Sequence, residues 1–528
     1  MNVLPLLALL LGPLGFQEAV LALSGASCIE ELTEDEVRHY RSLEEHPVDV
    51  NRAGRSRLLS CGLFTPYQVA SLVDYRARNG DILSFAELSL VDGFAEAPVE
   101  ALKNFLTIES RNAPGQLESK LGRMSLTVGS SLKDGSFGGK IRCEAAFGEK
   151  AEAYWSDKAD FSGGQYGIGT VSGAYYGSGV LGKIVLGHFN ARFGQGLLAW
   201  SGFSTDSYSS SASFSRRPSG LAATGSTMAE HLGAAADFSL GRYTLSTAWS
   251  PGDKFCLADF SGVWRHLSAG LCLTREGASA SWRVSLPSSS IFGEAAYMFC
   301  GDFAAAAGVL WVPSYGNKFN LTLKRFPRAS KEYDSAAIGY EGKRLIATAD
   351  AGHRKDKHKS RFRALVIFRD EIARGDSLSI MPQARFSARL RPQEKAPLKL
   401  ELRIECGIRW KTHQAAARIH AAYCRNFSIL SYLEAGHSGG IFSLRLRATF
   451  FSAPTWDDRL YAWMPDAPGN FNIPAFYGKG WALSAHSALH LGRHHSIWLT
   501  GEYTARTRNG SPEDGRYRVS LQYRLKLF

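Results

Sequence analysis

The amino-acid sequence predicts a mainly β fold, with a large antiparallel transmembrane β-barrel of roughly 20 to 24 strands that follows a small all-α domain. Three observations support this prediction. The apolar residues change from helical spacing to strict alternation near residue 118. The alternating segments are roughly 8–12 residues long and are separated by Gly, Asp, Asn, Ser or Pro. The last segment alternates up to the aromatic residue Phe528.

The composition excludes several classes of protein. The 528 residues are 45% hydrophobic and 21% charged, which is incompatible with wholesale disorder. Residues 1–110 carry 8 basic and 16 acidic side chains, a net charge of −8, whereas residues 111–528 carry 53 and 33, a net charge of +20. Beyond the N-terminus, no apolar run approaches the roughly 18 residues that a membrane helix requires. A helical membrane protein is therefore excluded.

The N-terminus is expected to be a signal peptide that covers residues 1–26. Residues 3–16 form an apolar block that is too short to span a bilayer, and Ser24-Gly25-Ala26 offers a small-residue cleavage site. The alternatives are a lipid anchor on Cys28 and an apolar first helix. The 8 cysteines form no CxxC pair and no zinc spacing, so we interpret them as small hydrophobic residues.

Two helical regions are expected next. Residues 27–46 form an acidic helical lead, and residues 47–110 form a small module with helical spacing. Asn79-Gly80 is a flexible helix end, and Ser84 with Glu87 three residues later is a capping box. The helices that we expect in the module are Arg52–Ser60, Tyr67–Arg78, a short one after Ser84, and Glu96–Phe105.

Residues 118–528 are expected to form the barrel. In residues 398–406, for example, Leu, Ile and Cys alternate with Lys, Glu and Arg. A sandwich array and a propeller or solenoid are the competing all-β folds. Sandwich strands are commonly about 5–6 residues long, and propeller blades repeat every 40–50 residues, a period that we do not find. Long strands with charges at alternate positions suit a wet lumen better than a dry core.

Several motifs support a resemblance to known families. Residues 48–51, 73–80, 85–88 and 91–94 resemble a tandem helix-hairpin-helix module of the competence DNA-receptor type. The whole chain is similar to a Bacteroidota outer-membrane family that fuses this module to a large barrel. That second match rests on residues 193–197, 459–463 and 476–480, so we take Phe193, Gly194, Gly196, Tyr477, Gly478 and Gly480 as structural barrel motifs. Phe528 is a further structural motif, because a last strand that ends in an aromatic residue resembles the recognition signal of bacterial outer-membrane proteins.

The resemblance implies nucleic-acid binding by the hairpins, whose free amides would hold a phosphate. The candidate residues are Arg52, Arg55, Arg57, Gly62, Leu63, Gly93 and Phe94. Each hairpin, however, keeps one glycine of the Gly-apolar-Gly pattern and loses the other. Residues 47–110 also carry six basic and eight acidic side chains, which gives little electrostatic drive toward DNA. Structural docking is therefore favoured over DNA binding.

Other motifs point to no chemistry. Residues 194–199 satisfy GxGxxA, but no helix is expected after them, so a tight bend in the barrel wall is the better interpretation. The 14 histidines do not cluster as metal ligands, and nothing selects a catalytic group. The net charge of +20 in residues 111–528 has two interpretations: a cationic lumen, or Lys and Arg that face lipid phosphates at the rims, which is preferred.

The sequence therefore predicts a non-enzymatic outer-membrane barrel that acts as a pore or scaffold, with a periplasmic docking module that plugs or braces its mouth. The alternative is DNA binding or uptake through that module. We expect no cofactor and no metal ion. The expected partners are outer-membrane lipid, the barrel-assembly machinery, a periplasmic protein and, in the alternative, DNA.

Overall fold

The structure is a computed structural model of the whole chain. It describes residues 15–94, 98–109, 122–202, 208–226, 229–314, 316–328, 330, 332–374, 378–508 and 511–527. Phe528, the proposed terminal aromatic signal, lies outside these residues, as does most of the apolar block at the N-terminus. The start predicted for the barrel, residue 118, also lies outside them, and the first described strand begins at Arg123.

The N-terminal part consists of short helices and one pair of parallel two-residue strands. The helices are α2 (Phe16–Ser24), α3 (Glu34–Glu45), α4 (Arg55–Ser60), α5 (Pro66–Asn79), α6 (Phe85–Leu88) and α7 (Val99–Leu102), with a 3-10 turn η1 (Ile29–Glu31) and strands β1 (Val48–Asp49) and β2 (Leu106–Thr107). Thr33 and Thr65 form capping boxes at the starts of α3 and α5. Among the described helices, none is both long enough and apolar enough to cross a membrane.

The predicted helices of the module are present; α5 matches its prediction to within one residue at each end, whereas the first and last helices are shorter than expected. The first helix begins at Arg55 rather than at Arg52, because residues 50–52 turn and the amides of Asn51 and Arg52 bind the Asp49 carboxylate. Gly80 ends α5 with φ +87°, and Ser84 caps α6, both as predicted. The last helix is confined to α7, and residues 95–97 before it are not described.

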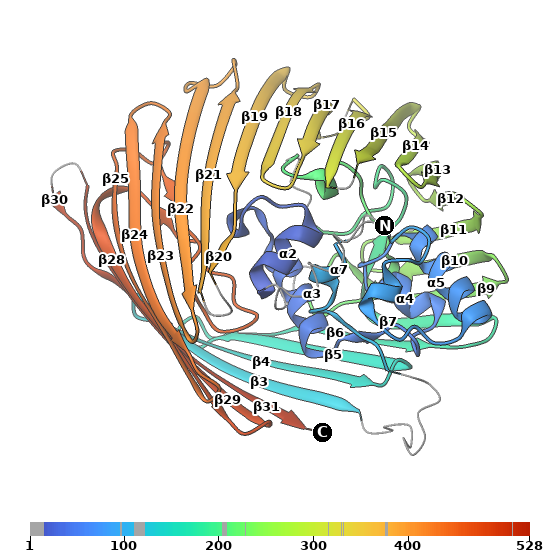
Figure 1. Cartoon of the computed structure of the whole chain (residues 1–528), viewed down its shortest axis with the longest axis horizontal. Coiled ribbons are helices and arrows are strands. Elements are labelled where there is room, and N and C mark those ends of the chain that lie inside the picture. The colour runs from blue at the N-terminus through green and yellow to red at the C-terminus, as the bar shows by residue number, and fades with distance from the viewer. Residues whose placement is uncertain are drawn as a thin grey trace.

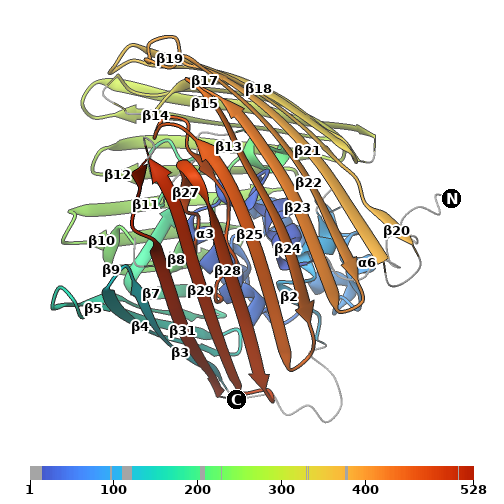
Figure 2. The same cartoon turned by 90° about the vertical axis from the view of Figure 1, so that its left-hand side faces the viewer.

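The rest of the chain forms one closed antiparallel barrel (Figures 1 and 2). Its wall contains 24 strands in the described residues, within the predicted range. They are β3 (Arg123–Lys133), β4 (Ser136–Phe147), β5 (Ala151–Asp160), β6 (Gln165–Tyr176), β7 (Leu181–Arg192), β9 (His231–Leu240), β10 (Tyr243–Ser250), β11 (Phe255–Trp264), β12 (Leu267–Thr274), β13 (Gly277–Leu286), β14 (Ser289–Met298), β15 (Asp302–Ser314), β16 (Asn317–Arg325), β17 (Asp334–Glu341), β18 (Leu345–Arg354), β19 (Lys359–Arg369), β21 (Leu378–Leu390), β22 (Leu398–Trp410), β23 (His413–Tyr423), β24 (Phe427–Ser438), β25 (Phe442–Ala453), β28 (Gly478–Leu491), β29 (His495–Arg508) and β31 (Arg516–Leu527).

Five shorter elements accompany the wall. They are β8 (Gly220–Ala223), β20 (Ile372–Arg374), β30 (Ser511–Pro512) and the hairpin of β26 (Leu460–Tyr461) with β27 (Ala475–Phe476). The barrel closes where the last strand pairs with the first, from Met124 opposite Leu527 to Lys133 opposite Arg518. Closure leaves no unpaired strand edge, which a hydrocarbon environment requires.

Side chains alternate between the two faces of the wall as the sequence predicts. On β31, Val519 and Leu521 are 44% and 48% exposed on the outer face, whereas Gln522 and Arg524 are 2% and 6% exposed on the lumen side. The same pattern recurs on β22, where Leu402 and Ile404 face outward and Arg403 is buried inside. An apolar outer belt around a polar interior is the arrangement of a membrane-spanning barrel.

The two ends of the barrel differ in the length of their connections. At the end where β3 begins and β31 finishes, the wall strands are joined by turns such as 241–242, 265–266 and 411–412. The opposite end carries two long connections, residues 193–230 and 454–477. Short turns are typical of the periplasmic side of such barrels and long loops of the outer side. We call these ends the short-turn mouth and the long-loop mouth.

The helices lie inside the ring of strands rather than beside it (Figure 1). Their apolar side chains form one core, in which Phe64 and Phe94 are fully buried with ring centroids 5.6 Å apart. Helix α2 contributes Val20 and Leu23 to this core. Because α2 falls within residues 1–26, signal-peptide cleavage at the predicted site would remove it, and cleavage itself stays a prediction.

Aromatic residues near strand ends commonly lie at the membrane interfaces of such barrels, but only some of them do so here. Trp155 and Trp311 are exposed on the outer face. Tyr176, in contrast, is 6% exposed and contacts Arg57 of the module. Trp463 lies in the second long connection, where its amide donates to Glu30. Both residues contact partners inside the lumen. Sequence periodicity does not reveal such partners, because they lie far away in the chain.

Candidate functional site

The lumen is the candidate site, because the acidic lead of the module meets a basic wall there. Glu30 accepts hydrogen bonds from Arg418 and Arg403, with N–O distances of 2.6 and 3.1 Å. Glu31 accepts from Arg385 at 2.6 Å, and Glu45 accepts from Arg524. We call these seven residues the ion-pair belt: Glu30, Glu31, Glu45, Arg385, Arg403, Arg418 and Arg524.

Glu30 is the most enclosed carboxylate of the belt. Its side chain is 7% exposed, as is that of Arg403, while that of Arg418 is 10% exposed. Burial alone would raise the pKa of Glu30, but Arg403 and Arg418 outweigh it and hold the pKa well below its ordinary value. Glu30 is therefore a charged anchor between the lead and strands β22 and β23.

Arg57 forms a second anchor, on the other side of the module. Its guanidinium lies 2.6 Å from Glu152 and 3.3 Å from Glu149, and Tyr176 donates to Glu152 at 2.6 Å. Arg57 and Glu152 are 9% and 7% exposed. Burial opposes the charge of Arg57, but the surrounding acidic groups, first of all Glu152, raise its pKa well above the ordinary value. This anchor attaches α4 to strand β5.

The preferred interpretation of the basic barrel charge is wrong for the belt. Its four arginines lie on the lumen side of the wall and pair with the module, whereas the sequence favoured lipid-facing residues at the rims. The signal that could have revealed this was already visible. Residues 1–110 and 111–528 carry opposite net charges, and opposite charges that are buried together must pair.

The structure brings the predicted nucleic-acid residues into the interior. Arg52 pairs with Glu109 at 2.8 Å, and Arg55 donates to the carbonyls of Gly241 and Arg242 in a wall turn. Arg57 belongs to the second anchor. In the docked state these three side chains are therefore engaged by carboxylates and carbonyls, and a phosphate would have to displace those partners.

The hairpin residues serve the packing of the module. Leu63 and Phe94 are 3% and 0% exposed. Gly62 and Gly93 adopt φ +70° and +85°, a region that favours glycine. A Cβ at Gly93 would lie 2.9 Å from the Tyr67 ring. These positions thus stabilise turns within the module.

The motif residues on which the predicted helix-hairpin-helix resemblance rests have structural partners as well. The amide of Asn51 donates to the carbonyl of Ile82 at 2.9 Å, and its oxygen accepts from the Ile82 amide at 2.9 Å. Arg76 donates to the carbonyls of Val50, Asn51 and Ala53 at 2.7–2.9 Å. These contacts join the two halves of the module, which accounts for the motif without a nucleic-acid ligand.

The GxGxxA motif forms a turn that binds a carboxylate of the chain itself. The amides of Gln195 and Leu197 donate to Glu294 of β14 at 2.6 and 3.2 Å. Gly194 and Gly196 have φ +59° and +76°, and a Cβ at Gly194 would lie 2.6 Å from the Glu294 carboxyl carbon. The predicted tight bend is present, and its purpose is to fold the connection inward; Phe193 beside it is buried.

The second barrel motif starts β28 and fixes the other long connection. Gly478 has φ +83°, and a Cβ at Gly480 would collide with the carbonyl of Ala505 on β29. Tyr477 packs edge-on against Trp456 and lies under Arg506. The connection itself enters the lumen, where Asp466 pairs with Arg518 of β31 at 2.6 Å.

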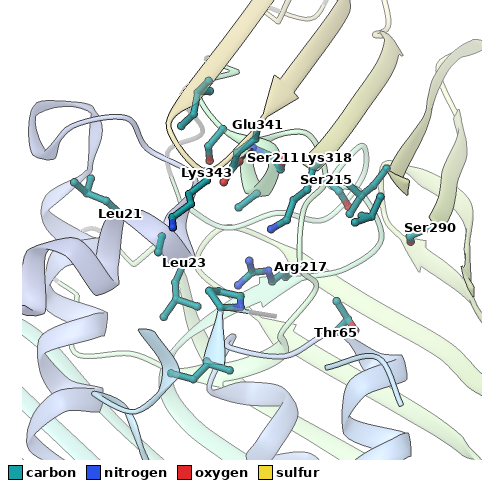
Figure 3. Close-up of a pocket in the computed structure, with 18 of the residues that line it drawn as sticks. Leu21, Leu23, Thr65, Ser211, Ser215, Arg217, Ser290, Lys318, Glu341 and Lys343 are labelled. Carbon is teal, nitrogen blue, oxygen red and sulfur yellow. Dashed lines mark hydrogen bonds between the residues drawn. The ribbon is translucent and has the colours of Figure 1, made fainter. Parts of the chain in front are cut away.

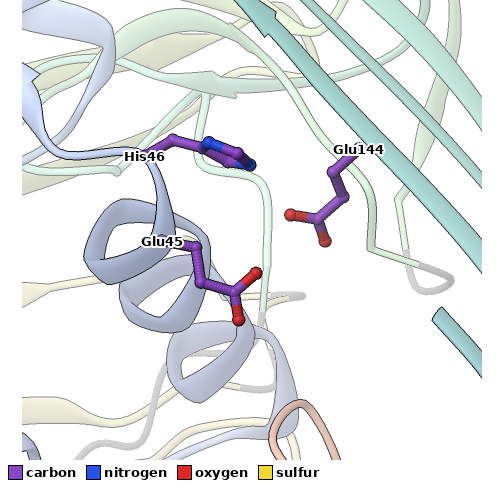
Figure 4. A group of neighbouring side chains, drawn as sticks. All are labelled: Glu45, His46 and Glu144. Atoms are coloured by element: carbon purple, nitrogen blue, oxygen red, sulfur yellow. The ribbon is translucent and has the colours of Figure 1, made fainter. Parts of the chain in front are cut away.

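Glu45, His46 and Glu144 form the single metal-like group in the described residues (Figure 4). One potential ligand atom of each lies within 4.8 Å of the others. Burial lowers the pKa of His46 to about 4, and neither ring nitrogen has a hydrogen-bond partner among the described residues. However, Glu45 binds Arg524, and the Nε of Arg142 lies 4.0 Å from Glu144. Two guanidinium groups thus already provide the positive charge that a metal ion would bring.

A cavity of about 920 Å³ remains between the module and the wall (Figure 3). Thr65 and Tyr67 of the module line one side, and Ser290 and Lys318 of the wall line the other. Tyr67 also contacts His266, in a turn of the short-turn mouth, at 3.3 Å. The lumen is thus filled on one side and hollow on the other.

A closed barrel with an apolar outer belt and an internal plug defines a membrane-spanning β-barrel protein. Comparison with protein-family models finds no match, and comparison with curated proteins finds none either. Among solved structures, the chain is similar to three Pseudomonas aeruginosa proteins over 77% of its length. They are OprD (8% identity, 95% of that chain, TM-score 0.35), the outer membrane protein OpdK (9%, 99%, 0.32) and OpdQ (9%, 99%, 0.33). Function is inferred below from this chain's own lumen.

Proposed function

We propose that the protein is a non-enzymatic outer-membrane conduit that its own N-terminal module keeps closed. The observation that carries this proposal is the module inside the barrel, attached to the wall by Glu30 on one side and Arg57 on the other. Barrels of 16–18 strands leave an aqueous channel, and those of 22 strands hold a plug. A 24-strand wall is wide enough to need one.

The orientation follows from the same geometry. The module precedes β3 and contacts turns of the short-turn mouth, such as 241–242 and the turn that contains His266. We therefore place the short-turn mouth and the module on the periplasmic side. A solute would pass along the hollow side of the lumen once the module shifts or leaves.

The proposed partners follow from the surfaces. Outer-membrane lipid contacts the apolar belt, and the barrel-assembly machinery receives β31, the strand that closes the wall. A periplasmic protein would act on the module at the short-turn mouth. Membership of the Bacteroidota family with a helix-hairpin-helix module is part of the same proposal and rests on the sequence motifs at residues 193–197, 459–463 and 476–480.

DNA binding by the module stays an alternative that requires release from the lumen. Arg55 and Arg57 are held by wall carbonyls and carboxylates in the docked state. Release would free them, whereas docking keeps them from a phosphate.

Planar-bilayer conductance of the full chain tests the proposal. The wild type is expected to be mostly closed, because the ion-pair belt holds the module. The double variant Glu30→Lys and Glu31→Lys places like charges against Arg385, Arg403 and Arg418, so long open states are expected. Glu100→Gln is the control, since among the described residues Glu100 pairs within the module, with Lys103 at 2.7 Å. Equal conductance in all three proteins would contradict the plug.

A further inference from the structure

The cavity of about 920 Å³ has a basic side whose charges lack acidic partners. Arg217 in the first long connection, Arg283 on β13, Lys318 on β16 and Lys343 in the turn after β17 all line it. Figure 3 shows the side chains of Arg217, Lys318 and Lys343 directed into the same space. The four residues come from separate parts of the chain, so the fold, not a local motif, gathers them.

Arg283 is held in place by neutral groups only. It donates to the hydroxyls of Ser215 and Ser290 and to the carbonyl of Arg216, and it lies over the Phe292 ring. None of the four basic residues forms an ion pair within 4.0 Å with a carboxylate of the described chain. Uncompensated guanidinium groups in a partly enclosed space attract an anion.

Five carboxylates also line the cavity: Glu18, Asp92, Glu341, Asp370 and Glu371. Four of them have other partners, since Glu18 pairs with Arg409, Glu371 accepts from the Ser379 hydroxyl, and Asp370 and Glu341 are engaged as follows. Asp370 pairs with Arg344 at 3.0 Å. Glu341, which is opposite Lys318 in the strand register, accepts from the Ser211 amide at 2.7 Å and lies 3.9 Å from Arg369. The remaining positive charge therefore stays on the basic side of the cavity.

The rest of the lining combines apolar side chains with serines and other polar groups. Leu63 and Leu102 of the module face the cavity, together with Leu310, Val312 and Ile367 of the wall. Helix α2 adds Leu21 and Leu23, but the basic side and these other apolar residues remain if residues 1–26 are removed. The cavity thus combines an anion-binding side with a hydrocarbon-like side in either form of the chain.

We propose that this cavity binds a small organic anion, with its charged head on Arg217, Arg283, Lys318 and Lys343 and its hydrocarbon part against the apolar part of the lining. Guanidinium and ammonium groups recognise carboxylate and phosphate heads alike. A cation is repelled, and a purely inorganic anion leaves the apolar side unused. The volume lies in the range of ligand pockets, about 300–1,000 Å³.

Calorimetry on the full chain in detergent tests this site with hexanoate, its neutral analogue hexanamide, and inorganic phosphate. Hexanoate is expected to bind with a dissociation constant of roughly 1 mM or lower. Hexanamide and phosphate are expected to bind at least about tenfold more weakly, because each lacks one half of the recognition. Equal binding of hexanamide or of phosphate, or no binding of hexanoate, would overturn the proposal.

Variants locate the site. Arg217→Gln is expected to weaken hexanoate binding by roughly tenfold or more, and Arg217→Lys to restore part of it. Lys411→Gln removes one positive charge from an exposed turn of the same mouth, outside the cavity, and is expected to change nothing. Unchanged binding in Arg217→Gln would refute the assignment, and a heat-dependent gel shift confirms that each variant is folded.

The binding test and the conductance test fail separately. If hexanoate does not bind but the Glu30→Lys and Glu31→Lys protein opens, the site is wrong and the conduit stands. If hexanoate binds and conductance never responds to the module, the site stands and the conduit is wrong.

Discussion

Glu30 offers the most direct test of how the module is retained. Replacing it with Gln keeps the shape of the side chain but leaves Arg403 without the carboxylate that lies 3.1 Å away. Arg418 keeps Glu405 at 2.7 Å, so the loss is concentrated on one guanidinium. Breaking a buried ion pair costs about 3–5 kcal/mol, and the lower figure applies here. At ~3 kcal/mol, the released population rises on the order of 100-fold.

Cys28 reports that population, because it is 7% exposed and lies beside Arg385 and Arg403 of the wall. Burial raises the pKa of its thiol to about 11, so docked protein reacts slowly with a maleimide. When release is fast relative to reaction, the labelling rate follows the released fraction. Glu30→Gln is therefore expected to accelerate labelling of Cys28 by about 100-fold, as measured by peptide mass spectrometry with the other cysteines as references.

Glu100→Gln is the matched control, since it removes an acidic side chain of the same module that makes no ion pair with the wall. A folded Glu30→Gln protein whose Cys28 reacts no faster than in this control would refute the reasoning. Retention would then depend on packing of the apolar core rather than on the ion-pair belt.

Three further predictions concern acidity, the inward turn and DNA. Burial, with Arg192 adding to it, lowers the pKa of His39 from 6.5 to about 4, so a released module binds this proton at higher pH than a docked one. Docking of the module must therefore weaken as the pH falls from 6.5 toward 4. Bilayer recordings are expected to show more openings at pH 5 than at pH 7. This increase is expected to be smaller in His39→Gln. Gly194→Ala is expected to destabilise the barrel by roughly 1–3 kcal/mol through its clash with Glu294, seen as a lower melting temperature, whereas Gly501→Ala, with open space around it, should match the wild type. Duplex DNA is expected to leave the electrophoretic mobility of the docked full chain unchanged; a shift comparable to that of a released variant would show that the module binds DNA in place.

The barrel was largely predictable from the sequence because its wall obeys one simple rule. A strand between lipid and water must alternate, and Val519, Leu521 and Arg524 follow that rule without reference to any partner. The predicted range of roughly 20 to 24 strands, which contains the observed 24, and the closing strand followed from the same pattern. Periodicity is a local property, so a single sequence reveals it.

The contents of the lumen were not predictable in the same way. Alternation shows that Arg403 faces inward, but not that Glu30 lies there to meet it, since the two are hundreds of positions apart. The hairpin glycines Gly62 and Gly93 look alike in a DNA-binding turn and in a packed one. The loss of their partner glycines favoured packing over DNA binding, which stays a prediction; in the structure, a Cβ at Gly93 would lie against the Tyr67 ring.

The GxGxxA turn shows that the amides of a ligand-binding motif can bind a side chain of the same protein instead. Its amides hold a carboxylate, as they would hold a phosphate, but the carboxylate belongs to Glu294. Nothing in the local sequence distinguishes the two outcomes. Only the expectation that no helix follows the motif favoured a bend, and the structure shows what that bend binds.

The acidic lead also has a consequence for biogenesis. Glu30 and Glu31 are translated long before the arginines that surround them in the folded protein. Their negative charges are therefore present when the barrel closes. If the barrel closed without the lead, Arg403 and Arg524 would lie in the interior without the carboxylates of Glu30 and Glu45. We therefore expect that removal of the N-terminal segment impairs assembly of the barrel before it alters permeability.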